Sequence, residues 1–401
     1  MKILVKESII KSRIIKVING VWCLPLVLIM RSLHKLTLVK LCGIRADRIG
    51  HFVSDSAEQF ARFSHYGSKT LTLYFLEGKS ANLQWELMVR RNLPNLKGKW
   101  LGYVAFWNKT LPGGKRHQLK SSLTRSRDLE GLFQKTSVAF SFTSPEDDFG
   151  KNWLKSKGWQ EGEPFIALLV RDSKYLQVTK PDQSWDYHNY RNSDIQDYLP
   201  AIEWLIENRV WVFRMGRHTK EKLEISNNKF VDYSQGGCTS DLLDIWIFAN
   251  ATAIISTSTG IDQLGGLYSR PTLFLNALPL FELASYFNMT WVPKNLIWHK
   301  SKEPLNLHQS VEHSYYIDSQ YSKNGIEIVN LTQLEILESV KEFWHRLNNV
   351  YTDTSSEIER QKQFWKSLKT QPNYHKFHKY IHPEARVGSY WLCAQGDNFL
   401  K

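Results

Sequence analysis

Two kinds of apolar spacing alternate along the chain. Short unbroken apolar runs are typical of strands buried in a parallel sheet, and apolar residues three or four apart are typical of helices. In the second half of the sequence the two patterns alternate every 20–40 residues, which predicts a doubly wound sheet. The expected strands there are 165–170, 210–213, 229–233, 252–256 and 271–275, and the expected helices are 195–207, 241–248 and 261–268.

The first half shows the same alternation less regularly. Its expected strands are 48–53 and 70–76, its expected helix is 82–91, and a third apolar run covers 100–107. Ser54 and Asp55 are candidate caps of a helix that follows the first of these strands. Residues 145–162 are rich in charged and turn residues, so we expect them to join the two halves.

These elements predict an α/β protein with two Rossmann-like, doubly wound domains that face a cleft. A length of 401 residues suits two ordinary domains. We expect the first domain at 46–150 and the second at 160–350. Further helices are expected at 333–347 and 357–368, and residues 351–401 are expected to form a helical tail that packs back on the first domain.

Positive charge is concentrated at the N-terminus. The chain carries a net charge of +13, and residues 1–45 contain nine Lys or Arg but only one acidic residue, Glu7. Residues 17–30 are uncharged and contain Pro25, and fourteen residues are fewer than the ~20 that a spanning helix needs. We therefore expect a basic, amphipathic segment at 1–45 that lies on an anionic membrane surface, although a basic helix packed on the protein itself would give the same pattern.

The rest of the composition narrows the class of protein. Apolar residues make up 42% and charged residues 23%, as in a globular chain. The basic N-terminal residues are interleaved with long aliphatic side chains, and no nucleic-acid-binding motif is present, so nucleic acid is not an expected partner. The four cysteines are scattered, which favours reduced thiols in a cytoplasmic protein.

Polar residues follow three of the expected strands of the second domain. In open α/β sheets, ligands bind beyond the carboxyl ends of the strands, where helix N-termini favour phosphate. The candidates for donor binding at these ends are Arg171 after the first strand, Arg214, Gly216 and Arg217 after the second, and Ser258, Thr259, Gly260 and Asp262 after 252–256. Alternatively, the arginines are solvated surface residues, and Ser258 or Thr259 only caps a helix.

Arg191 and Asn192 are two further candidates for donor binding. They lie in 185–194, where aromatic and polar residues are densely grouped before a helix, as sugar or base recognition requires. A polar surface loop whose aromatic rings pack on the helix is the alternative.

His51 and Asp55 are the candidates for catalysis in the first domain. They lie at the end of the strand expected at 48–53 and in the loop after it, and either side chain could accept a proton from an acceptor hydroxyl. The alternatives are a structural histidine and an N-cap.

Several common catalytic motifs are absent. The sequence has no Asp-x-Asp pair at an expected strand end, no Walker loop, no G-x-G-x-x-G and no G-x-S-x-G. We therefore expect no bound metal and no cofactor, and kinase, dehydrogenase and hydrolase activities become less attractive.

Residues 258–275 resemble the donor-binding segment of heptosyltransferase-type enzymes of the two-Rossmann (GT-B) glycosyltransferase class. Four ordered motifs, at 48–52, 190–195, 214–217 and 256–262, resemble a family of glycosyltransferases from bacterial surface-polysaccharide (O-antigen and capsule) gene clusters. The resemblance runs from about Asp47 to the C-terminus, but residues 276–279 depart from the heptosyltransferase pattern.

The resemblance implies metal-independent transfer of a sugar from a nucleotide sugar, held by the second domain, to a glycan or lipid-linked acceptor on the first. It places Thr259, Gly260 and Asp262 in the donor-phosphate loop and Asp55 near an acidic base. The enzyme would work peripherally on the inner face of the cytoplasmic membrane. A non-sugar transferase of pyruvyl or glycerophosphate type and a non-catalytic sugar-nucleotide-binding scaffold remain the alternatives.

Overall fold

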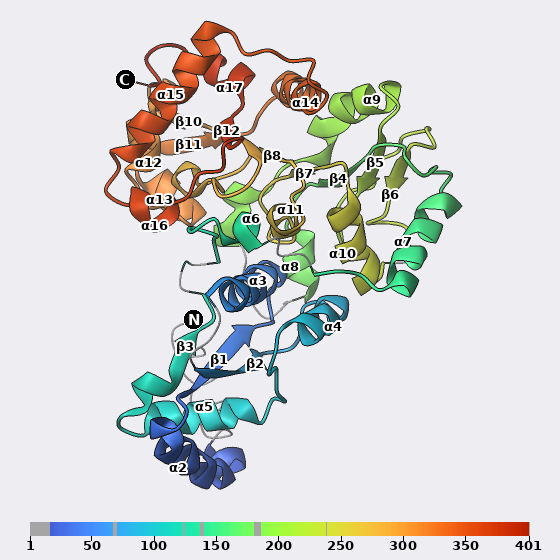
Figure 1. The fold of residues 1–401 in the computed structure, drawn as a ribbon. Helices are drawn as coiled ribbons and strands as arrows, with labels where there is room; N and C mark the ends of the chain where they lie inside the picture. Colours follow the sequence, from blue (N-terminus) through green and yellow to red (C-terminus); the bar gives the residue numbers. More distant parts are fainter. Residues whose placement is uncertain are drawn as a thin grey trace. The chain divides into compact units, whose positions relative to one another are not determined.

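The chain divides into two compact units. The structure, a computed structural model, describes residues 17–66, 70–122, 124, 126–136, 140–179, 186–237 and 239–400 (Figure 1). Unit 1 comprises 1–126 and 132–141, and unit 2 comprises 127–131 and 142–401. Each unit is an α/β structure with a parallel sheet, as the apolar spacing predicts.

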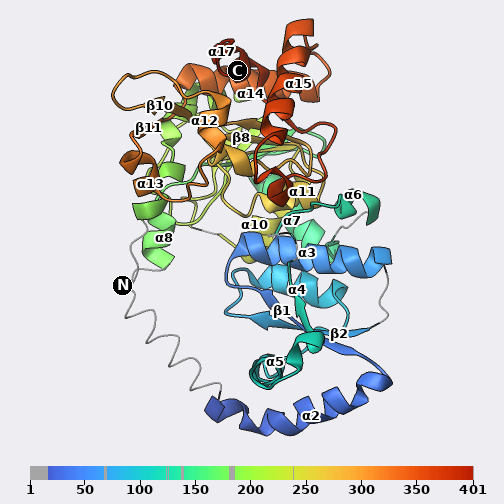
Figure 2. The same cartoon turned by 90° about the vertical axis from the view of Figure 1, so that its left-hand side faces the viewer.

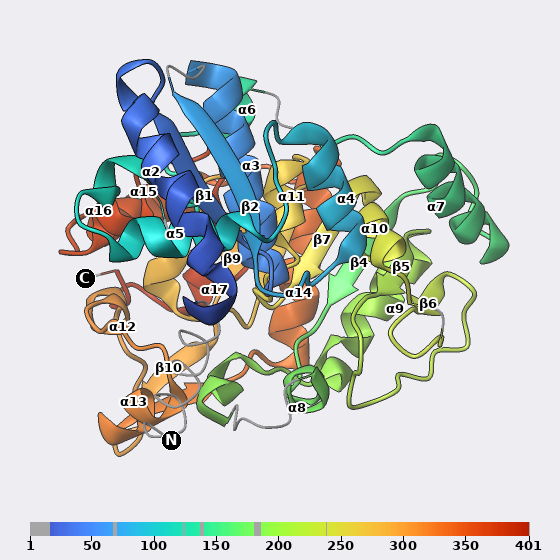
Figure 3. The same ribbon diagram turned by 90° about the horizontal axis from the view of Figure 1, so that it is seen from below.

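Unit 1 has three layers. Its sheet has the order β2-β1-β3, and both neighbours pair with β1 in parallel. Helices α3 and α4 cover one face, while α2 and α5 cover the other face and lie against each other (Figures 2 and 3). The elements are α2 (Leu24–Ser32), β1 (Val39–Arg45), α3 (Ile49–Tyr66), β2 (Leu71–Glu77), α4 (Leu83–Asn92), α5 (Leu101–Thr110), β3 (Gln118–Lys120) and α6 (Leu132–Thr136).

Two predictions for unit 1 are wrong. The strand expected at 48–53 is the first part of α3, and the first strand is β1, inside the segment assigned to the membrane surface. In α3 the buried residues Phe52, Val53, Ser56 and Ala57 recur at helical spacing, which a five-residue apolar run does not reveal. The apolar run at 100–107 is likewise a helix, α5, with Leu101 and Val104 buried three residues apart.

Unit 2 has a seven-stranded parallel sheet of order β12-β9-β8-β7-β4-β5-β6. Its first six strands in sequence are therefore arranged 3-2-1-4-5-6, the order of a dinucleotide-binding Rossmann sheet. The strands are β4 (Phe165–Leu169), β5 (Trp211–Arg214), β6 (Phe230–Asp232), β7 (Ala253–Ser256), β8 (Thr272–Leu275), β9 (Met289–Val292) and β12 (Arg386–Val387). A separate antiparallel pair is formed by β10 (Asn295–Trp298) and β11 (Ile326–Val329).

Helices cover both faces of this sheet. In Figure 1, α9 and α14 lie on one side of the strands and α10 and α11 on the other. Ile255 packs in the same cluster as the buried residues of α9 and α14, whereas its neighbour Ile254 meets Gly265 of α11. The helices are α7 (Ser144–Ser156), α8 (Lys174–Thr179), α9 (Leu199–Glu207), α10 (Asp241–Asn250), α11 (Gln263–Leu267), α12 (Leu307–Val311), α13 (Asp318–Lys323), α14 (Gln333–Leu347), α15 (Ser355–Lys369), α16 (Tyr374–Phe377) and α17 (Ser389–Ala394). The 3-10 turns are η1 (Val21–Cys23), η2 (Leu33–Lys35), η3 (Gly114–His117), η4 (Asp186–Arg191), η5 (Ile195–Tyr198) and η6 (Leu280–Glu282).

The segment expected to join the halves is instead helix α7 of unit 2. Thr143 and Glu146 form a capping box at its start, so the cluster of acidic residues read as a turn stabilises a helix N-terminus. Asp147 accepts a hydrogen bond from Nε1 of Trp246 at 2.9 Å, which ties α7 to the buried helix α10.

The C-terminal residues belong to unit 2 and do not form a separate tail. Strand β12 pairs with β9 at the edge of the large sheet, and Phe364, Trp391 and Phe399 lie in its main apolar core. The predicted capping box of Thr332 and Glu335 is present at the start of α14. The sheet therefore uses the chain from Phe165 to Val387.

Candidate functional site

The strand order of unit 2 reverses between β4 and β7, and two predicted loops meet there. Such a switch point opens a crevice at the carboxyl edge of the sheet, where ligands of this fold bind. The amide of Arg171, after β4, donates to Oγ1 of Thr257, after β7, at 3.0 Å. The amide of Thr257 donates in turn to the carbonyl of Leu169 at 3.2 Å. The two loops are therefore held side by side, as expected.

Four residues gather at this edge and are called here the Asn192 cluster: Arg171, Arg191, Asn192 and Lys294. The side-chain amide oxygen of Asn192 accepts a bond from Nε of Arg171 at 3.3 Å. Its backbone carbonyl accepts a bond from Nζ of Lys294 at 2.6 Å. The guanidinium of Arg191 donates to the carbonyl of Ser258 in the β7–α11 loop. Three cations from different parts of the sequence thus surround one asparagine and one loop.

The cluster holds its positive charge against neutral partners. In the described part of the chain, no carboxylate lies within ion-pair distance of any of its three cations. Burial lowers the pKa of Arg171 to about 10, with a further contribution from the nearby charge of Arg191. Burial also lowers the pKa of Lys294 to about 8, although the more distant carboxylate of Asp318 opposes this. An anionic ligand would relieve this mutual repulsion.

Buried polar atoms without a hydrogen-bond partner in the described structure include Nε of Arg191, in the cluster, and Oγ1 of Thr259, beside it. Buried donors without partners are costly, so such atoms are commonly completed by a ligand. Because Arg191 is bonded to Ser258, the residue before Thr259, both atoms lie at the same loop.

In the β7–α11 loop the backbone amides of Thr259 and Gly260 are bonded to the side chain of Asp262, so they are not the free donors that the phosphate-loop expectation requires. Oδ2 of Asp262 accepts from the amide of Thr259 at 2.6 Å and from Oγ of Ser256 at 2.8 Å. Its Oδ1 accepts from the amide of Gly260 at 3.2 Å. The Asp262 residue is only 1% exposed, so its carboxylate holds the loop from inside and is not displayed to a sugar hydroxyl. A positive φ of 60° at Ser258 marks the turn that this carboxylate braces.

Arg214 and Arg217 do not form a free diphosphate clamp. Arg214 is the last residue of β5, where it lies opposite Asp232 of β6, and their side chains form a buried ion pair at 2.9 Å. Arg217 bonds to Asp241 at 2.6 Å and also pairs with Asp244 at the start of α10. Gly216 between them adopts a φ of 129°, which glycine tolerates. These arginines secure strand and helix ends within unit 2.

A cavity of about 260 Å³ opens beyond the ends of β4 and β5. Its walls include Asn192 of the cluster, Val170 and Asp172 from the end of β4, and Lys220 and Asn330. Asp172 is fixed by backbone amides, because its two oxygens accept from Lys174 and Lys220 at 2.8 and 2.7 Å. The cavity borders the cluster through Asn192, and the acidic side chains of Asp194 and Glu221 also line it.

In unit 1 the structure brings His51 and Asp55 together on one face of α3. Both side chains contact Ser126, whose Oγ lies 2.8 Å from Nδ1 of His51 and donates to Oδ1 of Asp55 at 2.6 Å. Oγ of Ser121 donates to Oδ2 of Asp55 at 3.1 Å. Both residues lie within α3, so the expected strand end and loop positions, and the alternative N-cap role of Asp55, are wrong. Asp55 is 4% exposed, and among the described residues its carboxylate has only hydroxyl partners.

Burial acts on these two groups in opposite directions. It lowers the pKa of His51, and the positive charges of Arg45 and Arg48 lower it further. It raises the pKa of Asp55, although the bonds from Ser126 and Ser121 oppose that effect. His51 is therefore kept neutral at neutral pH, in the form that can accept a proton. Nε2 of His51 has no hydrogen bond in the described structure.

Lys294 and Ser126 are the site residues that sequence reasoning missed. Lys294 lies two residues beyond β9, so recognising 289–292 as a strand would have placed it at the carboxyl edge with the other cations. Ser126 joins α3 only through the fold, 71 residues beyond Asp55. Trp185, in the segment 185–194, lies outside the described residues, and Tyr190 of the same segment packs on Tyr321.

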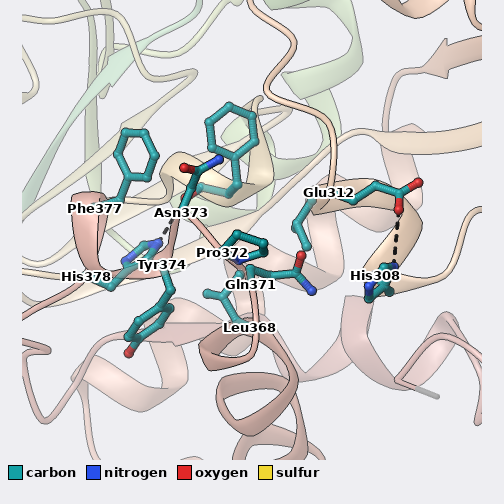
Figure 4. A pocket seen from close by; sticks show the side chains of 11 residues that line it. His308, Glu312, Leu368, Gln371, Pro372, Asn373, Tyr374, Phe377 and His378 are labelled. Carbon is teal, nitrogen blue, oxygen red and sulfur yellow. Dashed lines mark hydrogen bonds and ion pairs between the residues drawn. The ribbon is translucent and has the colours of Figure 1, made fainter.

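A second cavity of unit 2, of about 210 Å³, lies away from the strand ends (Figure 4). Phe281, Tyr374 and Phe377 contribute aromatic rings to its walls. His378 bonds through both ring nitrogens, to Oγ of Ser285 and to the carbonyl of Phe281, each at 2.9 Å. Burial lowers the pKa of His378 to about 4, so it is a neutral structural residue.

Within the described residues, no group of three or more His, Cys, Asp or Glu side chains is arranged to hold a metal ion.

Comparison with known proteins yields two distant structural similarities. No family model and no curated protein matches the sequence. A glycosyl transferase of family 9 from Veillonella parvula DSM 2008 shares 8% identity at a TM-score of 0.40, over 63% of this chain and 86% of that one. E. coli ADP-heptose LPS heptosyltransferase II shares 10% identity at a TM-score of 0.39, over 77% of this chain and 100% of that one. At these values neither similarity carries a conclusion about activity.

Proposed function

We propose that the protein is a glycosyltransferase that moves a sugar from a nucleoside-diphosphate sugar to a hydroxyl of a glycan or lipid-linked acceptor. The observation that carries this proposal is the Asn192 cluster: the buried Lys294 and the half-buried Arg171 and Arg191, without a carboxylate partner among the described residues, at the switch point of a Rossmann-order sheet. A diphosphate matches this arrangement in charge, and the adjoining cavity gives room for the remainder of the donor.

The same cations suit the chemistry of the leaving group. When the bond between the anomeric carbon and the phosphate oxygen breaks, its electron pair leaves with the nucleoside diphosphate. The negative charge that develops needs stabilisation, which fixed cations in a partly buried site supply effectively. Arg171, Arg191 and Lys294 would therefore do the work that a divalent metal does in other transferases, and we propose a metal-independent reaction.

For the acceptor side we propose His51 as the general base and Asp55 as the residue that positions it. The acceptor oxygen forms the new bond to the anomeric carbon and gives its proton to Nε2 of His51. Nδ1–H of His51 then donates to Ser126, whose hydroxyl donates to Asp55. The imidazolium formed is stabilised through this chain, the same logic by which a carboxylate supports a catalytic histidine.

The test is donor binding in the presence of EDTA, measured by calorimetry or thermal shift against UDP-, GDP-, ADP-, dTDP- and CMP-linked sugars. We expect one nucleotide to raise the melting temperature. The variant Arg171→Gln/Arg191→Gln should weaken its binding at least tenfold, because a charge-assisted hydrogen bond contributes roughly 1.5–3 kcal/mol.

Arg209→Gln is the matched control. Arg209 is exposed and precedes β5, so it lies at the amino edge of the same sheet, opposite the cluster. It should leave donor binding unchanged. If no nucleotide sugar binds, with or without divalent metal and acceptor, the proposed function is wrong. Donor binding without turnover in any acceptor screen would favour a sugar-nucleotide-binding scaffold.

A further inference from the structure

The turn η1 and most of helix α2 are apolar on every side. No charged side chain occurs between Val17 and Met30. A surface helix of a water-soluble protein ordinarily carries polar residues on the face turned away from the core, and a helix that is apolar all round is ordinarily buried. Among the described residues, Val17–Lys35 is also the helix that is long and apolar enough to cross a membrane.

Only one stripe of this helix packs on unit 1. Gly20, Cys23, Val27 and Met30 are buried, at intervals of three or four residues. The last three belong to the cluster that includes Leu101 and Val104 of α5 and residues of β1 and β2. A Cβ at Gly20 would lie 2.9 Å from Cβ of Tyr103, so the glycine permits a close approach to α5. The helix is thus docked along unit 1 by its inner stripe.

Arg31 fastens the end of the helix to the same unit. Its guanidinium donates to the side chain of Asn108 at 3.0 Å and to the carbonyls of Asn108, Leu111 and Pro112 at 2.7, 3.2 and 2.6 Å. A helix that crossed a bilayer would have to break these bonds and expose its inner stripe. These contacts with unit 1 therefore favour a helix that lies parallel to a bilayer surface, and they disfavour a helix that crosses the bilayer.

The outer face remains uncovered in the described structure. Its most exposed residues are Ile18 at 67%, Leu28 at 61% and, just past the helix, Leu36 at 85%. Trp22 lies in η1, and Trp100 is the residue before α5. Their rings lie 6.5 Å apart, and both side chains are exposed. The other exposed apolar residues of this face are Val17, Val21, Leu26, Ile29 and Leu33. Aromatic rings beside aliphatic chains are characteristic of surfaces that enter the interfacial layer of a bilayer.

Charge complementarity identifies the partner. Residues 1–45 hold nine Lys or Arg against Glu7 alone, five of them at positions 2–16 that precede the helix in the sequence. Lys35, which ends the helix, is exposed. Basic residues next to an apolar face in the sequence are attracted to anionic lipid headgroups.

We propose that the outer face of α2, together with Trp100, is a docking surface for an anionic lipid bilayer, on which the helix lies in the interfacial plane without crossing. The proposal does not depend on the proposed glycosyl transfer. Either a transferase or a scaffold could bind the bilayer through this surface.

The test is flotation of the full chain with vesicles of phosphatidylglycerol mixed with phosphatidylcholine, and with vesicles of phosphatidylcholine alone. We expect binding to the anionic vesicles and at least tenfold weaker binding to the neutral ones. Raising the salt from about 0.1 M to about 1 M, which shortens the Debye length from roughly 10 to 3 Å, should weaken the anionic binding. Alkaline carbonate should release the bound protein.

The variant Leu28→Gln/Ile29→Gln should weaken binding by about a hundredfold, because two large aliphatic side chains that would leave water on binding are replaced by polar ones. Both side chains are exposed, so the thermal unfolding of the variant should match that of the parent chain. Leu334→Gln is the matched control. Leu334 is an equally exposed leucine of α14 in unit 2, and its loss should leave binding unchanged.

Three results would overturn the proposal. Absence of vesicle binding by the intact chain would show that lipid is not the partner. Resistance to carbonate would show that the helix spans the bilayer. A dimer in light scattering that Leu28→Gln/Ile29→Gln converts to a monomer, without vesicle binding, would show that a second copy covers this face.

Discussion

The candidate sites of the two units hold charges of opposite sign, each with neutral partners. In unit 1 the carboxylate of Asp55 is held by the hydroxyls of Ser121 and Ser126. In unit 2 the cations of the Asn192 cluster are held by amide and carbonyl oxygens. Structural pairs such as Arg214 with Asp232 bring opposite charges together instead. Neutral partners alone do not define a site, because the buried carboxylate of Asp262 also has only a hydroxyl and backbone amides as partners among the described residues and serves to brace a loop.

The largest expected effect is on turnover, through the base in unit 1. His51→Gln should lower kcat by about 10²–10⁴-fold, the usual contribution of a positioned general base. Donor affinity should not change, because the donor is assigned to unit 2. The measurement is steady-state kinetics with the donor found in the binding screen. His65→Gln, an exposed histidine on the same helix, is the control, and an equal loss of kcat in both variants would contradict the assignment.

The next effect is on stability, at an ion pair of unit 2. Arg214→Met leaves Asp232 with a buried and uncompensated charge, which typically costs about 3–5 kcal/mol. Urea unfolding of the variant should show this loss. The double variant Arg214→Met/Asp232→Asn should recover most of the lost free energy of unfolding. If it does not, Arg214 stabilises the fold by contacts other than its ion pair with Asp232.

A smaller effect is expected at Lys294. Lys294→Met should weaken donor binding by roughly tenfold to a hundredfold, the range for a lost charge-assisted hydrogen bond. Because burial lowers the pKa of Lys294 to about 8, the parent chain should bind the donor less tightly as the pH rises through 8, when Nζ loses its proton. The variant should lack that dependence. Calorimetry from pH 7 to pH 9 measures it, with the exposed Lys323→Met as control.

The smallest effect is on the pH dependence of stability at Asp55. Burial raises its pKa, so the folded state holds the proton more tightly than the unfolded state. The resulting contribution to stability is fully present below the unfolded pKa and is lost as the pH rises through the folded pKa. The melting temperature of Asp55→Asn minus that of the parent chain should therefore increase by roughly 1–3 °C as the pH rises from acidic to neutral. If this difference instead decreases as the pH rises, the folded state favours the ionised form of Asp55.

Local patterns predicted the sheet of unit 2 well and unit 1 poorly, for a physical reason. Strands such as β4 and β7 are buried on both faces, so each is a continuous apolar run bounded by polar residues. The start of α3 and the whole of α5 are also short apolar runs, and helix and strand cannot be separated there by run length. Strand β1 was missed because it follows an apolar segment with no turn signal between them.

The site was predictable as far as strand ends determine it. Arg171 follows β4 and was predicted from that strand end, whereas Asn192 follows the turn η4 and was predicted from the composition of its segment; the fold joins them by a hydrogen bond. The roles of Arg214 and Asp262 were not predictable, since their partners depend on the pairing of β5 with β6 and on the exact path of a loop. Lys294 needed the recognition of a strand, Met289–Val292, that carries no distinctive pattern.

The edge position of β12 has a consequence for biosynthesis. Unit 1 is complete once Ser141 has been made, but the core of unit 2 needs Trp391 and Phe399, about 250 residues later. At a synthesis rate of roughly 5–20 residues per second, these residues are made about 10–50 s after unit 1, and the apolar core of unit 2 stays incomplete during that time. Under the proposed docking of α2 on a bilayer, unit 1 would attach before the core of unit 2 is complete.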